Sequence, residues 1–237
     1  MSKQINIALI GNPNTGKTSV FNALTGLNQK VGNYPGITVD KKEGVCKLPN
    51  GEKAHILDLP GTYSLNASSL DESVVIDLLL NAENKDYPDV AVVVTDVENL
   101  KRNLLLFTQI KDLKIPTILA INMADRMKRK AISLDVERLE KELKTKIALI
   151  SSRKNQGFDE LKELIANYRQ VSSEPCMNAS VIAPEYFDRL KEREWRASSR
   201  LFFVKIILRQ DYSSSRMIPM KSSPTRLHHP RRSPPRE

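Results

Sequence analysis

The sequence predicts a doubly wound α/β domain over residues 1–170, with a mostly parallel sheet, one antiparallel edge strand and helices on both faces. Two observations carry this prediction. Short apolar runs rich in Val and Ile, typical of strands buried on both faces, alternate with segments whose apolar residues recur at helical spacing. In addition, the turn GNPNTGKT joins the first apolar run to the first helical segment, and such turns hold phosphate groups.

The expected elements follow one another in chain order. The hairpin is clearly marked, because Asn50-Gly51 is a strong signal for a two-residue turn. Gly26 is expected to end the first helix, and Ser133 is a candidate cap for a later one. The elements are strand 5–11, helix 17–26, hairpin 38–60, strand 89–96, helix 98–114, strand 117–125, helix 133–144, strand 146–152 and helix 157–169.

Composition narrows the possible classes of protein. Hydrophobic residues make up 40% of the 237 residues, which suffices for a sizeable core, while no apolar run has the roughly 18 residues of a membrane-spanning helix. The N-terminus lacks the features of a signal peptide. Cys46 and Cys176 lie far apart and in no metal-ligand spacing, which favours two free thiols over a disulfide. We therefore expect a cytoplasmic chain.

A net charge of +9 could indicate a nucleic-acid partner, but the positive charge is concentrated in the C-terminal tail. Residues 197–237 contain nine Lys or Arg and two acidic residues, so the other 196 residues carry only +2. This Ser-, Pro- and Arg-rich tail is expected to be disordered. Because it lacks interleaved aromatic residues, nucleic acid is not the expected partner.

The turn after the first strand matches the phosphate-loop pattern G-x-x-x-x-G-K-[ST]. Its glycines let backbone N–H groups surround phosphates at a helix N-terminus, Lys17 adds a positive charge, and Thr18 offers a hydroxyl to Mg²⁺. A chance match is the alternative interpretation. The expected nucleotide-binding residues here are Gly11, Asn12, Pro13, Asn14, Thr15, Gly16, Lys17, Thr18 and Ser19.

A second motif, D-x-x-G, follows the strand that ends the hairpin. Asp58 is expected to reach Mg²⁺ through water, and the Gly61 amide to bond a γ-phosphate. Asp and Gly are also common turn residues, so the functional interpretation of this motif depends on its position after a strand. The next residue is Thr62, where many nucleotide switches have a Gln that orients the attacking water.

Two further stretches predict the specificity for the base. Asn122 and Asp125 form N-x-x-D, and the Asp carboxylate can accept hydrogen bonds from guanine N1–H and N2–H₂, a donor pair that adenine lacks. Met123 stands where a Lys is usual, and its thioether can still cover the base. A helix-capping Asp is the alternative interpretation. Ser151 and Ser152 follow the last strand, where loop backbone would meet guanine O6, although any serine loop would look similar.

The segment Val31–Lys41 is expected to be a mobile switch loop. Within it, Gly36, Ile37 and Thr38 are expected near the nucleotide, with Thr38 binding Mg²⁺ only when a γ-phosphate is present. The alternative is that Thr38 simply begins a strand.

Taken together, residues 3–168 resemble the cytosolic G domain of the ferrous iron transport protein B family. The resemblance rests on IGNPNTGKTSVFNALTG, VGNYPGITVDKKEG, LDLPGTYSL and INMAD, in that order. It implies a P-loop GTPase that binds GTP and GDP with Mg²⁺ and hydrolyses GTP slowly, with stimulation by K⁺. It also implies that Asn14 is the K⁺ ligand, that the loop around 32–34 closes over the ion, and that Lys17, Thr38 and Gly61 join Asn14 in catalysis.

The family lacks the Gln after D-x-x-G, as this chain does. A monovalent cation near the phosphates would offset developing negative charge, as an arginine finger does elsewhere. In the family a helical spacer and a membrane domain that moves Fe²⁺ follow the G domain, which lies on the cytoplasmic side of the inner or plasma membrane. The resemblance therefore implies a permease domain as partner, and small accessory proteins of iron transport as further candidates.

The chain departs from this pattern beyond the G domain. Residues 171–196 are similar to the start of the helical spacer and are expected to be its remnant, whereas the tail 197–237 does not look like the spacer. A truncated or frame-shifted end is expected, and a fragment that does not itself conduct iron. The alternatives are an RNA-associated GTPase of the ribosome-assembly type, with the basic tail on RNA, and a fragment that binds nucleotide without hydrolysing it.

Overall fold

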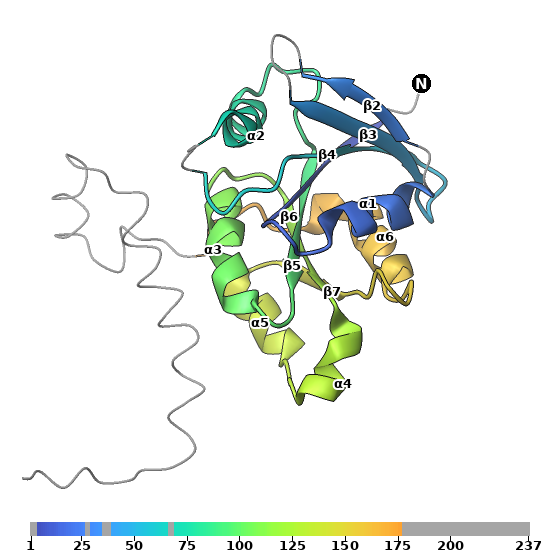
Figure 1. The fold of residues 1–237 in the computed structure, drawn as a ribbon, viewed down its shortest axis with the longest axis vertical. Helices are drawn as coiled ribbons and strands as arrows, with labels where there is room; N and C mark the ends of the chain where they lie inside the picture. The colour runs from blue at the N-terminus through green and yellow to red at the C-terminus, as the bar shows by residue number, and fades with distance from the viewer. Residues whose placement is uncertain (1–3, 27–28, 35–38, 66–68, 177–237) are drawn as a thin grey trace, which may run out of the picture.

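The computed structural model describes residues 4–26, 29–34, 39–65 and 69–176. They form a seven-stranded sheet in the order β2-β3-β4-β1-β5-β6-β7 (Figure 1). The strands are β1 (Ile5–Gly11), β2 (Gln29–Asn33), β3 (Asp40–Lys47), β4 (Lys53–Asp58), β5 (Val90–Asp96), β6 (Thr117–Asn122) and β7 (Lys146–Leu149). The helices are α1 (Lys17–Thr25), α2 (Leu70–Leu80), α3 (Leu100–Lys111), η1 (Ala124–Arg126), α4 (Met127–Lys130), α5 (Val136–Leu143), α6 (Phe158–Ala166) and η2 (Tyr168–Gln170).

The predicted α/β fold class is confirmed. Strands β4, β1, β5, β6 and β7 pair in parallel, whereas β3 pairs antiparallel with β4 through the predicted hairpin. Sequence analysis missed β2, which pairs antiparallel with β3 and forms the outer edge. All five of its residues are exposed, so it carries no apolar alternation that would mark a strand. Residues 31–33, expected in a mobile loop, therefore lie in a strand.

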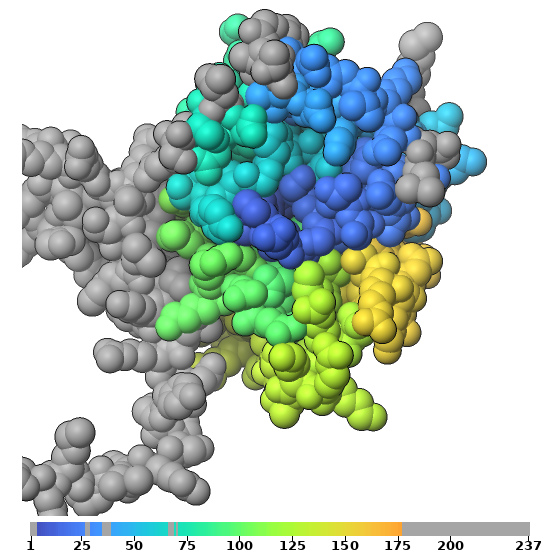
Figure 2. Space-filling model, viewed as in Figure 1, coloured from blue at the N-terminus to red at the C-terminus, as the bar shows by residue number. Residues whose placement is uncertain are grey.

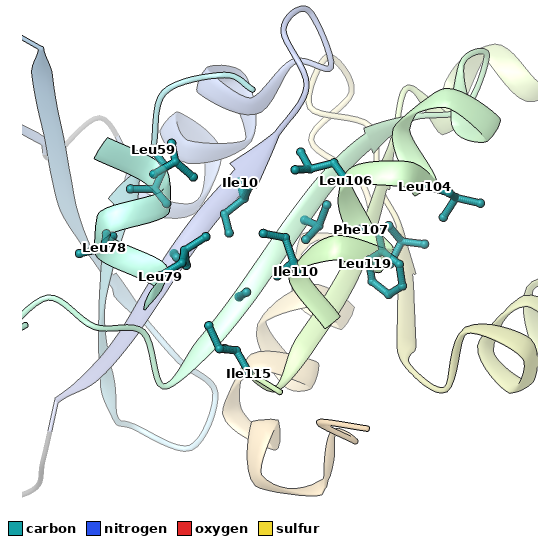
Figure 3. Close-up of a cluster of buried hydrophobic side chains, with 14 of the residues drawn as sticks. Ile10, Leu59, Leu78, Leu79, Leu104, Leu106, Phe107, Ile110, Ile115 and Leu119 are labelled. Carbon is teal, nitrogen blue, oxygen red and sulfur yellow. The ribbon is translucent and has the colours of Figure 1, made fainter. Parts of the chain in front are cut away.

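The sheet separates two hydrophobic cores, as expected for a doubly wound fold. One core lies under α2, α3 and α5, where Ile10 of β1 faces Leu106 and Ile110 of α3 (Figure 3). The other lies under α1 and α6 and contains Phe21 and Leu161. Because both faces are covered, the central strand β5 is buried along its whole length. This packing holds the carboxyl ends of the parallel strands in fixed positions, and the candidate site is built there.

Two helix features differ from the sequence prediction. Helix α2 was missed, because its sequence LDESVVIDLLL has apolar residues almost all round and no clear polar face. It begins at a capping Ser69, whose hydroxyl accepts a hydrogen bond from the Glu72 N–H at 3.3 Å. The prediction of Ser133 as a cap was wrong: Asp135 caps α5 by accepting from the Arg138 N–H at 3.0 Å.

The segment after the last helix packs back onto the domain. Lys111 at the end of α3 is fully buried, and its ammonium donates to the carbonyls of Lys144 at 2.9 Å and Ser172 at 2.6 Å. Both cysteines are free, as predicted. The structure buries them, and burial raises the pKa of Cys176 to about 11. At neutral pH this thiol is therefore protonated and unreactive.

The chain beyond residue 176 lies outside the described residues, and with it most of the expected spacer remnant and all of the expected tail. Within the described ranges, none of the helices has the length and hydrophobicity that crossing a bilayer demands.

Candidate nucleotide-binding site

Four loops meet at the carboxyl edge of the parallel strands, which is where doubly wound sheets bind ligands. They follow β1 (residues 11–16), β4 (59–62), β6 (123–125) and β7 (150–157). In the space-filling view the blue N-terminal segment, which contains the first loop, reaches the surface between the teal, green and yellow-green parts of the chain (Figure 2). The structure thus brings together segments up to about 140 residues apart in sequence.

The phosphate loop has the tight geometry that the glycine pattern predicts. The Thr15 hydroxyl donates to the Asn12 carbonyl at 2.9 Å and closes the turn, while Asn14 adopts a left-handed φ of 67° and is exposed. Gly16 precedes α1 with a φ of 81°, and a Cβ there would lie 2.4 Å from Asn122 Nδ2. A Cβ at Gly11 would lie 2.6 Å from the Val94 carbonyl oxygen. Only glycine fits these two positions, because neither neighbour can move freely.

Lys17 and Asp58 form an ion pair in this structure. The Lys17 ammonium donates to Asp58 Oδ1, and the two side chains are only 11% and 4% exposed. The positive group predicted for phosphates is thus held by the carboxylate predicted to face the metal. A phosphate group entering the loop could take the Lys17 ammonium from Asp58 and release this carboxylate for another partner.

The loop of the D-x-x-G motif runs along the phosphate loop. The Thr62 N–H donates to the Gly11 carbonyl at 3.2 Å, and Gly61 lies so close to Pro13 that a Cβ would be 3.3 Å from the ring. The Thr62 side chain is 1% exposed, with its hydroxyl 2.7 Å from the Ser64 carbonyl and 3.0 Å from Glu72 Oε1. The buried Thr62 side chain therefore stabilises the loop, and its hydroxyl forms its hydrogen bonds within the protein.

Asn122 joins the phosphate loop to the predicted base pocket. Its side chain is 1% exposed, its Nδ2 donates to the Thr15 carbonyl at 2.9 Å, and its Oδ1 accepts from the Ser152 N–H at 3.1 Å. One amide thus connects three loops, so the residue expected in base recognition has a clear positioning role. Sequence spacing predicted the residue but not these partners.

Asp125 is oriented by Ser151, whose hydroxyl donates to Asp125 Oδ1 at 2.8 Å. This hydrogen bond is the main cause that lowers the pKa of Asp125, so the carboxylate stays ionised and able to accept. Ser151 is itself held by paired backbone hydrogen bonds with Gln156. The N–H groups of Ser151 and Ser152 therefore donate within the protein here, and either would have to change partner to meet guanine O6. Met123, expected over the base, packs against the core beneath α2 and α3.

Of the switch segment, Gly36, Ile37 and Thr38 lie outside the described residues. Its two ends are described, and the Tyr34 N–H donates to the Val39 carbonyl at 3.0 Å. The Tyr34 ring is buried in the core, where burial and the nearby Asp86 carboxylate raise the pKa of its hydroxyl. The base of the loop is therefore closed and anchored.

Sequence reasoning missed the contacts that α3 makes with the D-x-x-G loop. Gln109 is 2% exposed, and its Oε1 accepts from the Leu65 N–H at 2.7 Å. The Arg102 guanidinium lies 4.9 Å from the centre of the Tyr63 ring, a cation–π distance. No signal in the sequence distinguishes these two residues from the other polar residues of the helix.

Comparison with known proteins agrees with this geometry. The family model described as ferrous iron transport protein B matches residues 5–165. The chain belongs to this family.

Curated members of the family are much longer than the matched segment. The chain is 44% identical over 164 residues to the Fe(2+) transporter FeoB of Leptospira biflexa, covering 69% of this chain and 23% of the relative. It thus spans less than a quarter of that relative's length.

Solved structures of the family show the same fold. The G domain of the T. maritima FeoB iron transporter matches with a TM-score of 0.65 and 41% identity, covering 71% of this chain and all of that one. The cytosolic domain of the same transporter in a GDP form matches with a TM-score of 0.69 and 36% identity, over 86% of this chain and 80% of that one. The chain therefore contains a G domain of this family.

Proposed function

We propose that the chain binds GTP and GDP with Mg²⁺ and hydrolyses GTP slowly, with stimulation by K⁺, as the regulatory G domain of a ferrous iron transporter. The observation that carries this proposal is the double hydrogen bond of Asn122. These bonds hold Thr15 and Ser152 together and so fix the phosphate loop relative to the loops that carry Asp125 and Ser152. A single nucleotide needs this fixed spacing if its phosphates and its base are to bind at the same time.

The chemistry of the base pocket favours guanine. An ionised Asp125 accepts from N1–H and N2–H₂ of guanine, and its hydrogen bond from Ser151 aims the carboxylate. Adenine would place an acceptor opposite this acceptor and leave the carboxylate without partners. Discrimination of this kind is large, because unpaired polar groups in a closed site are costly.

The residues present fit Mg²⁺ of the kind that binds with nucleotides. Thr18 is exposed at the start of α1, and the Asp58 carboxylate, which pairs with Lys17 in this structure, would be released once Lys17 turned to the phosphates. Mg²⁺ keeps several waters and needs few protein ligands beside substrate oxygens. Accordingly, the site needs no cluster of carboxylates, and none occurs among the described residues. Thr38 would be the further ligand in the GTP state.

The K⁺ proposal rests on Asn14. Its exposed side chain and left-handed backbone set an amide oxygen at the rim of the phosphate loop. The resemblance adds backbone carbonyls from around residues 32–34, which in this structure belong to or follow the edge strand β2. Closure over the ion would therefore have to release part of the pairing between β2 and β3. A bound K⁺ would stabilise negative charge that develops on the phosphates.

Replacing Thr62 with Ala is expected to lower GTP turnover by no more than about threefold, because its hydroxyl braces the loop and does not face the attacking water. Phosphate release by the purified full-length chain, with GTP and Mg²⁺ in K⁺ buffer, measures this and tests the proposed activity itself. Thr62→Ser, which keeps the hydroxyl, is the control. A hundredfold loss in Thr62→Ala would show that this side chain positions the water.

Membership of the family supports the proposed role in transport. The membrane domain of the longer relatives would be the partner that the G domain regulates, with accessory proteins of iron transport as further partners. In that arrangement the domain lies on the cytoplasmic face of the membrane, and residues 171–196 continue it towards the helical spacer. No turnover together with intact GTP binding would instead identify a fragment that only binds nucleotide.

A further inference from the structure

Three buried polar side chains come from the phosphate loop, from β5 and from α3. Asn12, Thr95 and Asn103 are 2%, 0% and 1% exposed. Within the described part of the chain, both amide atoms of Asn12, the hydroxyl of Thr95 and the amide nitrogen of Asn103 have no hydrogen-bonding partner. Burying such a group without a partner is costly. Four such atoms therefore point to a ligand that satisfies them.

The register of the sheet brings the phosphate loop to the end of β5. Gly11 at the end of β1 pairs with Val94 of β5; Asn12 is the first residue after β1, and Thr95 is the next residue of β5. Side chains alternate between the faces of a sheet, so Thr95 lies on the face opposite to Val94. That face carries the core under α3, because Val93, two residues earlier on β5, and Ile10 of β1 belong to it.

Asn103 reaches the same place from α3. Its Oδ1 accepts from the N–H of Asp96, the residue after Thr95, at 3.0 Å. The amide nitrogen on the same group is therefore held at the end of β5, beside the residue that follows Thr95. The cluster thus joins three elements: the phosphate loop, β5 and α3.

The donors and acceptors of this cluster fit a water molecule. Two amide NH₂ groups donate, one amide oxygen accepts, and a hydroxyl does both. One water can accept two hydrogen bonds and donate two, and buried waters typically make about three. The cluster contains no charged side chain, which argues against an ion.

Helix α3 also holds the loop that carries Gly61. Gln109 accepts from the Leu65 N–H at 2.7 Å, and Arg102 stacks on Tyr63. Because a helix is rigid, whatever fixes α3 to the phosphate loop also fixes the distance between that loop and residues 63–65. We propose that Asn12, Thr95 and Asn103 bind an ordered water that ties the phosphate loop to α3, and that Thr95 and Asn103 are thereby positioning residues for the D-x-x-G loop.

The consequence for turnover rests on the proposed function, whereas the water site does not. During hydrolysis the Gly61 amide must meet the γ-phosphate at the right distance. A looser connection through α3 would cost turnover more than it costs ground-state binding, because the alignment matters most in the transition state.

The test replaces Thr95 with Val in the full-length chain, which removes one hydroxyl and keeps the shape. The matched control is Thr117→Val. Thr117 is equally buried, but it lies at the opposite, amino end of the neighbouring strand β6, where its hydroxyl donates to the Ile115 carbonyl at 2.7 Å. A high-resolution crystal structure, hydrogen exchange of residues 59–65 with GDP bound, and the kcat and KM for GTP are measured for each variant.

We expect the wild type to hold a water within about 3.2 Å of Thr95 Oγ1 and of at least one of the two amides. Thr95→Val should lose this water, speed exchange in residues 59–65 severalfold and lower kcat about three- to tenfold at unchanged KM. Thr117→Val should change none of these, although it lowers the melting temperature.

Direct hydrogen bonds among the three side chains, with no water between them, would overturn the assignment of the ligand. Equal exchange and kcat in Thr95→Val and the wild type would overturn the positioning role. If the wild type binds no GTP, the proposed function fails, yet the crystallographic water and the exchange rates without nucleotide still decide the inference.

Discussion

Asp125→Asn is expected to weaken GDP binding by at least about a hundredfold and to create binding of XDP. The Asn side chain turns one acceptor into a donor, which then opposes the N1–H or N2–H₂ of guanine. One hydrogen bond to a charged group, a contribution of about 1.5–3 kcal/mol, is lost, and the other becomes a weaker bond to a neutral amide. Xanthine has a carbonyl where guanine has its 2-amino group, so it accepts from the new amide. Calorimetric titration with GDP and XDP measures both effects.

The matched control for this change is Asp135→Asn, the same substitution at the cap of α5. Asn is as good a cap as Asp, so neither GDP binding nor stability should change appreciably. Unchanged GDP affinity in Asp125→Asn would place the base elsewhere and contradict the assignment of the pocket. A loss of GDP binding without a gain of XDP binding, together with a lower melting temperature, would point to misfolding of the loop.

GTP turnover is expected to be severalfold faster in K⁺ than in Na⁺, and Asn14→Ala is expected to abolish this difference. The Asn14 amide oxygen is the proposed ligand, and its removal leaves the cation without a protein side chain to hold it near the phosphates. Phosphate release at matched ionic strength in the two salts measures the effect. GDP affinity serves as the check that the phosphate loop still forms.

The variant Asn14→Gly distinguishes loss of the amide ligand from backbone strain. Asn14 has a φ of 67°, where Ala is strained and Gly is not, so Asn14→Ala alone would mix two effects. Both variants should lose the response to K⁺ if the amide oxygen is the ligand. A response that survives in Asn14→Gly would show that the Ala variant acted through strain. Equal wild-type rates in the two salts, with GTP binding intact, would refute the K⁺ mechanism.

The parts of the site that sequence predicted are those with a fixed local geometry. A phosphate loop needs Gly at Gly11 and Gly16 because a Cβ would strike the Val94 carbonyl or the Asn122 amide, and this requirement is visible as a motif. Strands buried on both faces, such as β5, were likewise predictable from their unbroken apolar runs. Periodicity and turn chemistry act over a few residues, and a single sequence displays them directly.

The parts that sequence did not predict depend on contacts between distant segments. Strand β2 forms because β3 offers it backbone partners, since all of its own residues are exposed and Val31 is its only large hydrophobic residue. The ion pair of Lys17 with Asp58 links residues 41 positions apart, and the hydrogen bond of Gln109 to Leu65 links residues 44 apart. Neither can be read from spacing, because many polar residues could have served. The hydrogen bond from the Ser152 N–H to Asn122 is another contact between distant segments that spacing does not reveal.

The central claim is that one guanine nucleotide bridges the phosphate loop and Asp125, held in register by Asn122. Titration of the full-length chain with GDP and with ADP, in the presence of Mg²⁺, tests this claim most directly. We expect GDP to bind with a stoichiometry of one and to raise the melting temperature, as any ligand of the folded state does, while ADP binds at least about a hundredfold more weakly. Equal affinity for GDP and ADP, or no binding of either, would contradict the account.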